Sequence, residues 1–217
     1  MKIVAISDTH NRHKKLEIPE CDLLIHAGDF TSFGYKHEIE DFAKWINKQS
    51  AKNVVIVPGN HELYFENGLP LSKEWIKDNC PNAHLLIEES VEIEGIKIYG
   101  SPITPWFHDW AWNRHPQQIT KHWNNIPEDT KILITHSPPY GILDETTYAN
   151  GDPKPGFLGC PQLLKRVQEI KPDLHFFGHI HAGYGEKHID GTSYYNCSNC
   201  DETYCPSNSP TVVEYEP

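Results

Sequence analysis

The sequence lacks an excess of basic residues. It holds 19 Lys and Arg against 30 Asp and Glu, which gives a formal net charge of -11 at pH 7 with histidine counted as neutral. Proteins that track along DNA or RNA neutralise phosphates with Lys and Arg and usually show a basic stripe, and none is visible here. The composition argues against a nucleic-acid polymer as a partner. A small anionic substrate is not excluded, because bound divalent ions would supply positive charge locally.

Long hydrophobic runs are also absent. No run approaches the roughly 18–20 apolar residues needed to cross a bilayer. The first residues form a strand-like run rather than the basic segment and long apolar stretch of a signal peptide. We therefore expect a soluble, cytoplasmic protein without a membrane partner. A cytosol keeps its six cysteines mostly reduced.

The cysteines lack the arrangement of a structural zinc site. Cys197, Cys200 and Cys205 form a cluster that is compatible with half of such a site or with a redox pair. A structural zinc normally needs a second pair, and the other three cysteines are not arranged as one. We interpret the cluster as free thiols.

What the sequence does contain is a series of short apolar runs, each followed by turn or breaker residues. Their β-branched content and their length of about four to eight residues predict strands. Their continuous apolarity indicates strands that are covered on both faces. The runs comprise residues 1–7, 22–27, 53–57, 84–87, 96–99, 131–135 and 174–177, with shorter ones at 194–195 and 212–213.

Helical patterns lie between these runs. In residues 37–48, Ile39, Phe42 and Ile46 follow one another at three- to four-residue spacing, with charged residues on the other face. Two further helices are predicted partly from the positions of prolines. The first of them stops before a proline, and the second has a proline in its first turn. These helices cover residues 71–79 and 161–170.

The order of the elements predicts the fold class. Alternating strands and helices early in the chain indicate a mainly parallel, covered sheet. Residues 85–101 instead resemble a hairpin with Glu94-Gly95 as its turn, which adds antiparallel content to an α/β fold. The length and the absence of a composition shift predict one domain over residues 1–217. Two long connections, 101–125 and 137–159, are candidates for functional loops.

Asp, Asn and His residues follow five of the predicted strands. In open α/β sheets ligands bind beyond the carboxyl ends of the strands, so we expect these side chains to meet at one edge. Such oxygens and imidazoles bind divalent cations, and two adjacent ions indicate phosphoester chemistry. Gly28, Gly59 and Gly178 each precede a candidate directly, where close packing would exclude a Cβ. The candidate ligands are Asp8, His10, Asp29, Asn60, His136, His179 and His181.

These segments form motifs in a fixed order over nearly the whole chain. The motifs are Asp-x-His at 8–10, Gly-Asp at 28–29 with a glycine at 34, Gly-Asn-His-Glu at 59–62, a single His at 136 and Gly-His-x-His at 178–181. This order resembles the calcineurin-like metallophosphoesterase superfamily. Stretches around Asp29, over 99–107 and over 178–185 are similar to its metallophosphoesterase-domain-containing subfamily of cyclic nucleotide phosphodiesterases. One departure is Thr135, where many members have Gly, and it changes the loop rather than the ligand.

The resemblance implies a four-layer α/β/β/α sandwich of two mixed sheets flanked by helices, and it divides the ligands between two metal ions. The first ion would take Asp8, His10 and His181. The second would take Asn60, His136 and His179, and Asp29 would bridge both. Such ions can lower the pKa of a bound water from 15.7 to about 7, so the implied nucleophile is a metal-bridging hydroxide. His-rich ligation favours transition metals, with Mn²⁺ preferred here and Fe, Ni or Zn as alternatives.

Residues beside the ligands have competing interpretations. In the family the position of His61 protonates the leaving oxygen, and histidine suits that role near neutral pH. Glu62 either orients a neighbour or belongs to the first turn of a helix, and we favour the helix. Arg12 is a candidate clamp for a phosphate oxygen, against the alternative of a solvated loop residue. Asn11 and His13 have weaker claims.

An aromatic stretch over residues 106–114 is the best indication of the substrate. Trp106, Phe107 and Asn113 are candidate substrate-binding residues, because flat rings bind bases by stacking. The alternative is a hydrophobic plug over the sheet edge or a contact between subunits. We predict hydrolysis of small phosphodiesters, cyclic nucleotides in particular. A metal-dependent phosphomonoesterase and, less favoured, a non-catalytic scaffold of the same fold are the alternatives.

Overall fold

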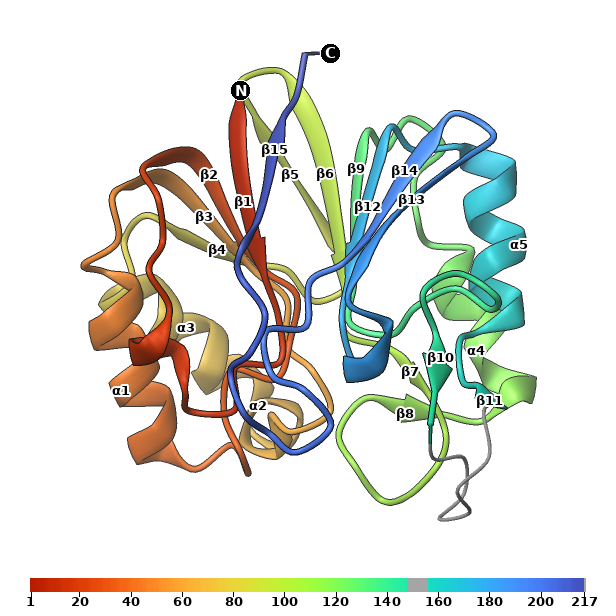
Figure 1. The fold of residues 1–217 in the computed structure, drawn as a ribbon. Helices are drawn as coiled ribbons and strands as arrows, with labels where there is room; N and C mark the ends of the chain where they lie inside the picture. The colour runs from red at the N-terminus through yellow and green to blue at the C-terminus, as the bar shows by residue number, and fades with distance from the viewer. Residues whose placement is uncertain (148–155, 217) are drawn as a thin grey trace.

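Two sheets packed face to face form the centre of the molecule, with helices on the outer side of each (Figure 1). The structure is a computed structural model, which describes residues 1–147 and 156–216. This arrangement is the predicted four-layer α/β/β/α sandwich. Part of the long connection over 137–159 lies outside the described residues. Among those described, no helix is long and apolar enough to span a bilayer.

The first sheet has the strand order β15-β1-β2-β3-β4. Its first four strands along the chain pair in parallel, and β15 adds an antiparallel edge. Helices α1 and α3 lie on its outer side, and the short α2 lies beyond the carboxyl ends of its strands (Figure 1). The bounds are β1 Lys2–Ile6, β2 Cys21–His26, β3 Ala51–Ile56, β4 Ala83–Leu85 and β15 Thr211–Glu214, with α1 Lys36–Ile46, α2 Leu63–Asn67, α3 Leu69–Asn79 and a 3₁₀ turn η1 at His13–Lys15.

The second sheet has the order β13-β14-β12-β9-β6-β5. Its inner strands are parallel, and β13 and β5 are antiparallel edges. Helices α4 and α5 cover its outer face (Figure 1). The bounds are β5 Glu89–Ile93, β6 Ile96–Ser101, β9 Ile132–Thr135, β12 Leu174–Phe177, β13 Gly185–Ile189 and β14 Thr192–Asn196, with α4 Pro116–Trp123, α5 Pro161–Ile170 and a 3₁₀ turn η2 at His181–Gly183. Short strand pairs join β7 Thr104–Pro105 to β8 Asn113–Arg114 and β10 Glu145–Thr146 to β11 Gly156–Phe157.

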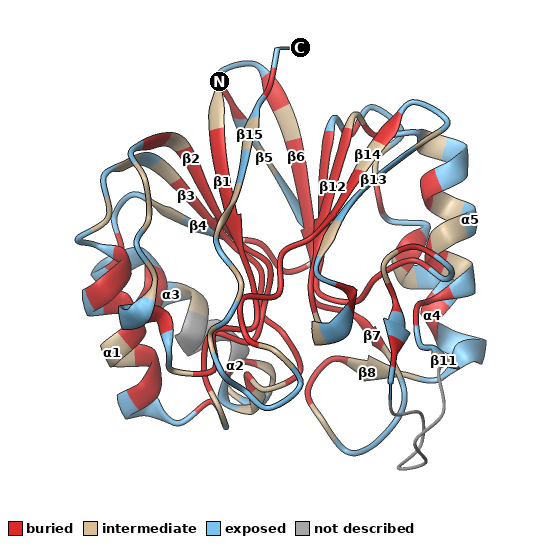
Figure 2. Cartoon of the chain, in the orientation of Figure 1, coloured by how far each residue is buried: buried red, intermediate tan, exposed pale blue. Residues whose placement is uncertain are grey.

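Alternate side chains of one strand enter different cores, which explains the continuous apolar runs. In β1, Ile3 and Ala5 face the core between the sheets, whereas Val4 and Ile6 face the core under α1. The other sheet contributes Ile134 to the central core and Leu133 to a third core beneath the helices of its own side. The inner strands are therefore buried on both faces, as Figure 2 shows by their colour.

The predicted hairpin is shorter than the sequence indicated. Leu85 ends β4 in the first sheet, and the hairpin of β5 and β6 begins only at Glu89, in the second sheet. Its turn is as predicted, since Glu94 and Gly95 both have positive φ, at 51° and 79°, as a two-residue hairpin loop favours. Helix α4 was missed within the connection over 101–125, because its short length left only Ile119 and Trp123 as a buried pattern.

Candidate metal centre

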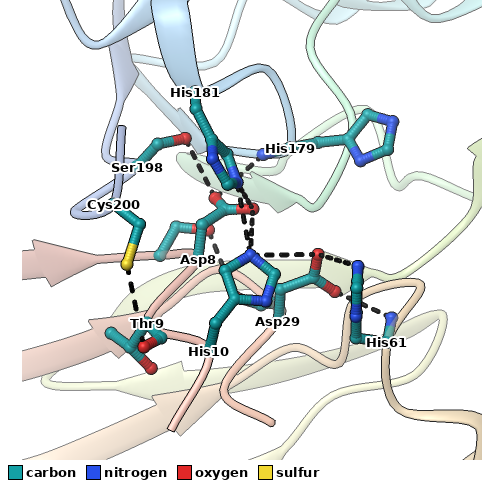
Figure 3. A network of polar contacts seen from close by, with 12 residues as sticks. Asp8, Thr9, His10, Asp29, His61, His179, His181, Ser198 and Cys200 are labelled. Atoms are coloured by element: carbon teal, nitrogen blue, oxygen red, sulfur yellow. Dashed lines mark hydrogen bonds and ion pairs between the residues drawn. The ribbon is translucent and has the colours of Figure 1, made fainter. Parts of the chain in front are cut away.

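The seven candidate ligands meet between the two sheets, where loops follow the carboxyl ends of the strands. Figure 3 shows five of them, which are Asp8, His10, Asp29, His179 and His181. Three groups of residues each offer ligand atoms that lie within 4.8 Å of one another. They are Asp8, His10 and His181; Asp29, His136 and His179; and His10, Asp29 and His61. The first group holds the three residues that the resemblance assigns to one ion, the second holds Asp29 with two residues assigned to the other, and the third adds His61. The division of these ligands between two ions stays a prediction.

The first group is centred on a carboxylate oxygen of Asp8. Its Oδ1 atom is buried without a hydrogen-bond partner among the described residues, 3.4 Å from Nε2 of His181 and 4.0 Å from Nε2 of His10. Its Oδ2 atom accepts hydrogen bonds from the His179 N–H and from Ser198 Oγ, each at 2.9 Å. One oxygen is thus fixed by the protein, while the other faces imidazole nitrogens, as a cation ligand would.

The second group joins the sheets. Oδ2 of Asp29 lies 3.3 Å from Nε2 of His136, which is also 2.9 Å from the Asn60 side-chain oxygen. The same Asp29 oxygen lies 3.9 Å from Nε2 of His10 in the first group. The carboxylate of Asp29 therefore faces ligands of both groups, which is the geometry that a bridging ligand requires.

The outward ring nitrogens of two histidines are held by backbone carbonyls. Nδ1 of His136 lies 2.9 Å from the Ala27 oxygen, and Nδ1 of His181 lies 2.9 Å from the Asp201 oxygen. Because a carbonyl only accepts, each Nδ1 carries the proton and Nε2 faces the cluster. Partners of this kind fix the tautomer of histidines that bind metals.

The glycines that precede candidate ligands have no room for a Cβ. A Cβ on Gly59 would lie 2.2 Å from Oδ1 of Asp29, and one on Gly28 would lie 2.2 Å from Nδ1 of His136. A Cβ on Gly178 would lie 2.0 Å from Oδ2 of Asp8. The close-packing role expected for these glycines is therefore what the geometry shows.

Several candidate ligands have left-handed backbones, which non-glycine residues rarely adopt. The φ angles are 51° at Asp8, 39° at His10, 57° at Asp29 and 69° at His179. Such strain costs about 1–3 kcal/mol per residue and gathers at functional sites. Its concentration at four of the candidate ligands sets this edge of the sandwich apart from an ordinary set of turns.

The charged groups of the cluster shift one another's pKa values. Burial alone would raise the pKa of Asp29, but the imidazoles of His136 and His61 hold it well below its usual range. Burial would lower the pKa of His136, but the Asp29 carboxylate outweighs it and raises this pKa to about 9. By contrast, burial lowers the pKa of His10 to about 4 and that of His179 to about 3. Asp29 is thus ionised, and the imidazoles of His10 and His179 are neutral and able to bind a cation.

His61 lies at the edge of the cluster with one ring nitrogen fixed. Its Nδ1–H donates to the Ser32 carbonyl at 2.6 Å, and its Nε2 lies 3.8 Å from Oδ2 of Asp29. The ring of Trp110 lies 4.4 Å from the His61 ring, between centroids. The Nε2 atom therefore faces the cluster. The sequence placed Trp110 in the aromatic stretch but did not indicate this contact.

Glu62 is the N-cap of α2, as the favoured helix interpretation expected, but it also orients its neighbours, which was the alternative. It is fully buried, and its carboxylate accepts hydrogen bonds from the N–H groups of Asp29 at 3.0 Å and Gly59 at 2.6 Å. The N–H and hydroxyl of Thr31 also donate to it, at 2.9 and 2.7 Å. Burial and the Asp29 charge raise the pKa of Glu62 to about 8. One carboxylate thus ties together two loops that carry ligands.

The residues proposed around His10 differ in their surroundings. Arg12 is exposed at the start of η1, and no hydrogen bond or ion pair joins its side chain to the cluster among the described residues. His13 is buried against Phe42 and Trp45 and pairs with an aspartate on α1 rather than facing the cluster. The role of Arg12 as a phosphate clamp stays a prediction.

The aromatic stretch divides between the two expected roles. Trp112 is buried in the core under α1, which is the plug interpretation. Trp106 and Phe107 are 49% and 37% exposed, and the Phe107 ring lies 5.4 Å from that of His179. The side chain of Asn113 holds the loop, since its oxygen accepts from the Phe107 N–H at 3.1 Å. Substrate binding by Trp106, Phe107 and Asn113 stays a prediction.

Two buried histidines outside the cluster support its loops. Nε2 of His26 lies 3.0 Å from Oγ1 of Thr9, between the ligands of the first motif. Nε2 of His175 lies 2.9 Å from Oγ1 of Thr135, the residue before His136.

All six cysteines are free, and Cys197 and Cys200 are buried, as the thiol interpretation expected.

A sequence model of the calcineurin-like phosphoesterase family matches residues 1–183. The chain belongs to this family. It is 37% identical to the human and mouse proteins named metallophosphoesterase domain-containing protein 1, over 98% of this chain and 70% of each relative. Membership implies a phosphoester hydrolase, and enzymes of this family depend on a centre of two metal ions.

Solved structures agree with the fold. One covers 99% of both chains with a TM-score of 0.66 at 17% identity. The protein TT1561 of Thermus thermophilus covers 90% of this chain and 88% of its own, with a TM-score of 0.60 at 16% identity. At this identity the likeness concerns the sandwich alone. The donor set of the cluster, which has an orphaned carboxylate oxygen and neutral imidazoles, fits divalent ions.

Proposed function

We propose that the protein is a dinuclear metal-dependent phosphodiesterase acting on small phosphodiesters, cyclic nucleotides in particular. The observation that carries this proposal is the position of Asp29 Oδ2. It lies 3.9 Å from Nε2 of His10, 3.3 Å from Nε2 of His136 and 3.8 Å from Nε2 of His61. Asp29 could bridge two ions, and the neighbouring imidazole of His61 could donate a proton. The arrangement therefore suits a two-ion site with a proton donor beside it.

The cations would be held by the residues that already converge. Asp8, His10 and His181 would hold one ion, Asn60, His136 and His179 the other, and Asp29 both. We favour Mn²⁺, with Fe, Ni or Zn as alternatives, because mixed imidazole and oxygen ligands suit these metals. When bound, the ions supply positive charge for the phosphate and an acidified water as the nucleophile.

Residues of the chain would position the substrate and protonate its leaving group. His61 is oriented by its Nδ1–H to the Ser32 carbonyl, so a proton on Nε2 can pass to the leaving ester oxygen. As the water oxygen bonds to phosphorus and the ester P–O bond breaks, this proton completes the alcohol product. Trp106 and Phe107, exposed beside the cluster, would contact the ester group, and Arg12 would have to turn inward to reach a phosphate oxygen.

The experiment is a substrate panel on metal-reconstituted protein. We expect Mn²⁺-loaded protein to hydrolyse bis-p-nitrophenyl phosphate and a 2′,3′- or 3′,5′-cyclic nucleotide. Hydrolysis of p-nitrophenyl phosphate without any diester would instead identify a phosphomonoesterase. A non-catalytic scaffold would bind metal and hydrolyse neither, but scaffolds usually lose ligands, and this chain has all seven and His61.

A further inference from the structure

A cleft of about 780 Å³ opens beside the cluster, and it is lined by aromatic residues from two distant parts of the chain. Phe107 comes from the loop between β7 and β8, and Tyr204 comes from the segment after β14. Phe107 contacts His179, whereas the Tyr204 ring lies 4.8 Å from that of His10 and 5.3 Å from that of His181. Each ring therefore flanks one of the two ligand groups at the cleft.

Tyr204 is fixed by a compact loop rather than free in solvent. The Asp201 carboxylate accepts hydrogen bonds from the N–H groups of Thr203 at 2.8 Å and Cys205 at 3.1 Å, and the Tyr204 N–H donates to the Asp201 carbonyl at 2.9 Å. The same carbonyl accepts from Nδ1 of His181. One residue thus orients a candidate metal ligand and the loop that carries the aromatic ring.

The described residues that line the cleft include no lysine or arginine that could receive a second phosphate, whereas they include Glu202. The Glu202 carboxylate is held there by the hydroxyls of Thr146 and Thr147, at 3.1 and 2.7 Å. An anionic group beyond the candidate metal centre would meet a fixed carboxylate that has no cationic partner among the described residues, which is unfavourable.

We propose that this cleft is the subsite for the ester group of the substrate, and that it takes one flat, uncharged group such as a nucleobase. Tyr204 and Phe107 recognise the ring by stacking, and Glu202 rejects substrates with a further phosphate. This inference rests on the proposed function and narrows its substrate class to diesters with a single phosphate. Tyr204 and Glu202 are specificity-determining residues, and neither was indicated by the sequence.

Binding of products separates recognition of the base from catalysis. We compare the dissociation constants of adenosine 5′-monophosphate and ribose 5-phosphate for Mn²⁺-loaded protein by calorimetry. The base should tighten binding by roughly tenfold or more, as stacking does elsewhere. Tyr204→Ala should lose most of this preference and Tyr204→Phe should keep it. Tyr140→Ala is the matched control, since Tyr140 is 43% exposed against 46% for Tyr204 and lines a separate pocket.

The charge of the cleft is tested with adenosine 3′,5′-bisphosphate. Glu202→Gln should tighten binding of this ligand several-fold and leave the monophosphate unchanged. A wild-type protein without preference for the base, or a preference that survives Tyr204→Ala, would overturn the subsite. These results do not depend on turnover, so failure of the wild type to hydrolyse any diester would overturn the proposed function separately.

Discussion

Oδ2 of Asp29 and Nε2 of His136 lie 3.3 Å apart, although Asp29 follows β2 of the first sheet and His136 follows β9 of the second. This carboxylate–imidazole contact is one of several that join the two sheets at the edge where their strands end. Only a sandwich with both sheets in this orientation brings these residues together.

Replacing Asp29 by Ala should remove the bridge between the two ligand groups. We expect bound metal to fall from two ions per chain to one or fewer, and turnover of bis-p-nitrophenyl phosphate to fall by more than about 10²-fold. Metal content measured by mass spectrometry checks the first effect. Asp129→Ala is the control, because that carboxylate is 68% exposed and pairs only with Lys97 among the described residues. Two retained ions and full activity in Asp29→Ala would rule out the bridge.

His61→Ala should separate proton donation from metal binding. If His61 is the donor, kcat should fall by about 10²–10⁴ while metal content stays at two ions per chain. The loss should be smaller for bis-p-nitrophenyl phosphate than for an alkyl ester, because nitrophenolate leaves without protonation. Since His61 also forms a possible ligand group with His10 and Asp29, a parallel loss of metal would make it a ligand instead.

Gly59→Ala should disturb the site by a steric clash and not by backbone strain, because Gly59 does not have a positive φ. The new Cβ would meet Asp29 Oδ1 at 2.2 Å, and overpacking of this kind costs about 1–3 kcal/mol. We expect weaker metal binding by calorimetry. Gly141→Ala is the complementary control, since it has φ of 76° and open space around the added Cβ. It should lose about 1–2 kcal/mol of stability in urea but bind metal normally. Equal metal affinities in the two variants would contradict the steric argument.

The buried His175 should make stability fall in acid. Burial lowers its pKa in the folded protein to about 3, whereas an unfolded histidine titrates near 6.5. Below about pH 6.5 the unfolded chain therefore binds one proton more than the folded chain, so the unfolding free energy falls as pH falls towards 3.

His175→Gln should isolate this effect, because glutamine can still donate to Thr135 but does not titrate. From pH 7 to pH 5, the wild type should lose about 2 kcal/mol more than the variant in urea unfolding with chelator present. Parallel losses over this range would show that His175 is not neutral in the folded protein.

The predicted strands and helices depended on local patterns, and most of them were found because buried strands have continuous apolarity. Hairpin length and helix α4 were missed for a physical reason. Leu85 pairs with β3 rather than with the hairpin, and α4 buries too few residues for a periodic signal. The orienting role of Glu62 was not favoured because its partners Asp29 and Thr31 lie about 30 residues away.

The sequence by itself indicated the candidate metal ligands that the fold brings together, because glycine, aspartate, asparagine and histidine at strand ends reflect local backbone requirements and ligand chemistry. It also indicated the α/β class through the spacing of apolar runs. Only the tertiary structure decided what surrounds those ligands. The rings of Tyr204 and Trp110 reach His10 and His61 through loops whose conformation depends on long-range hydrogen bonds. Contacts between segments far apart in the chain leave no periodic trace, so the substrate cleft could not be predicted from the order of residues.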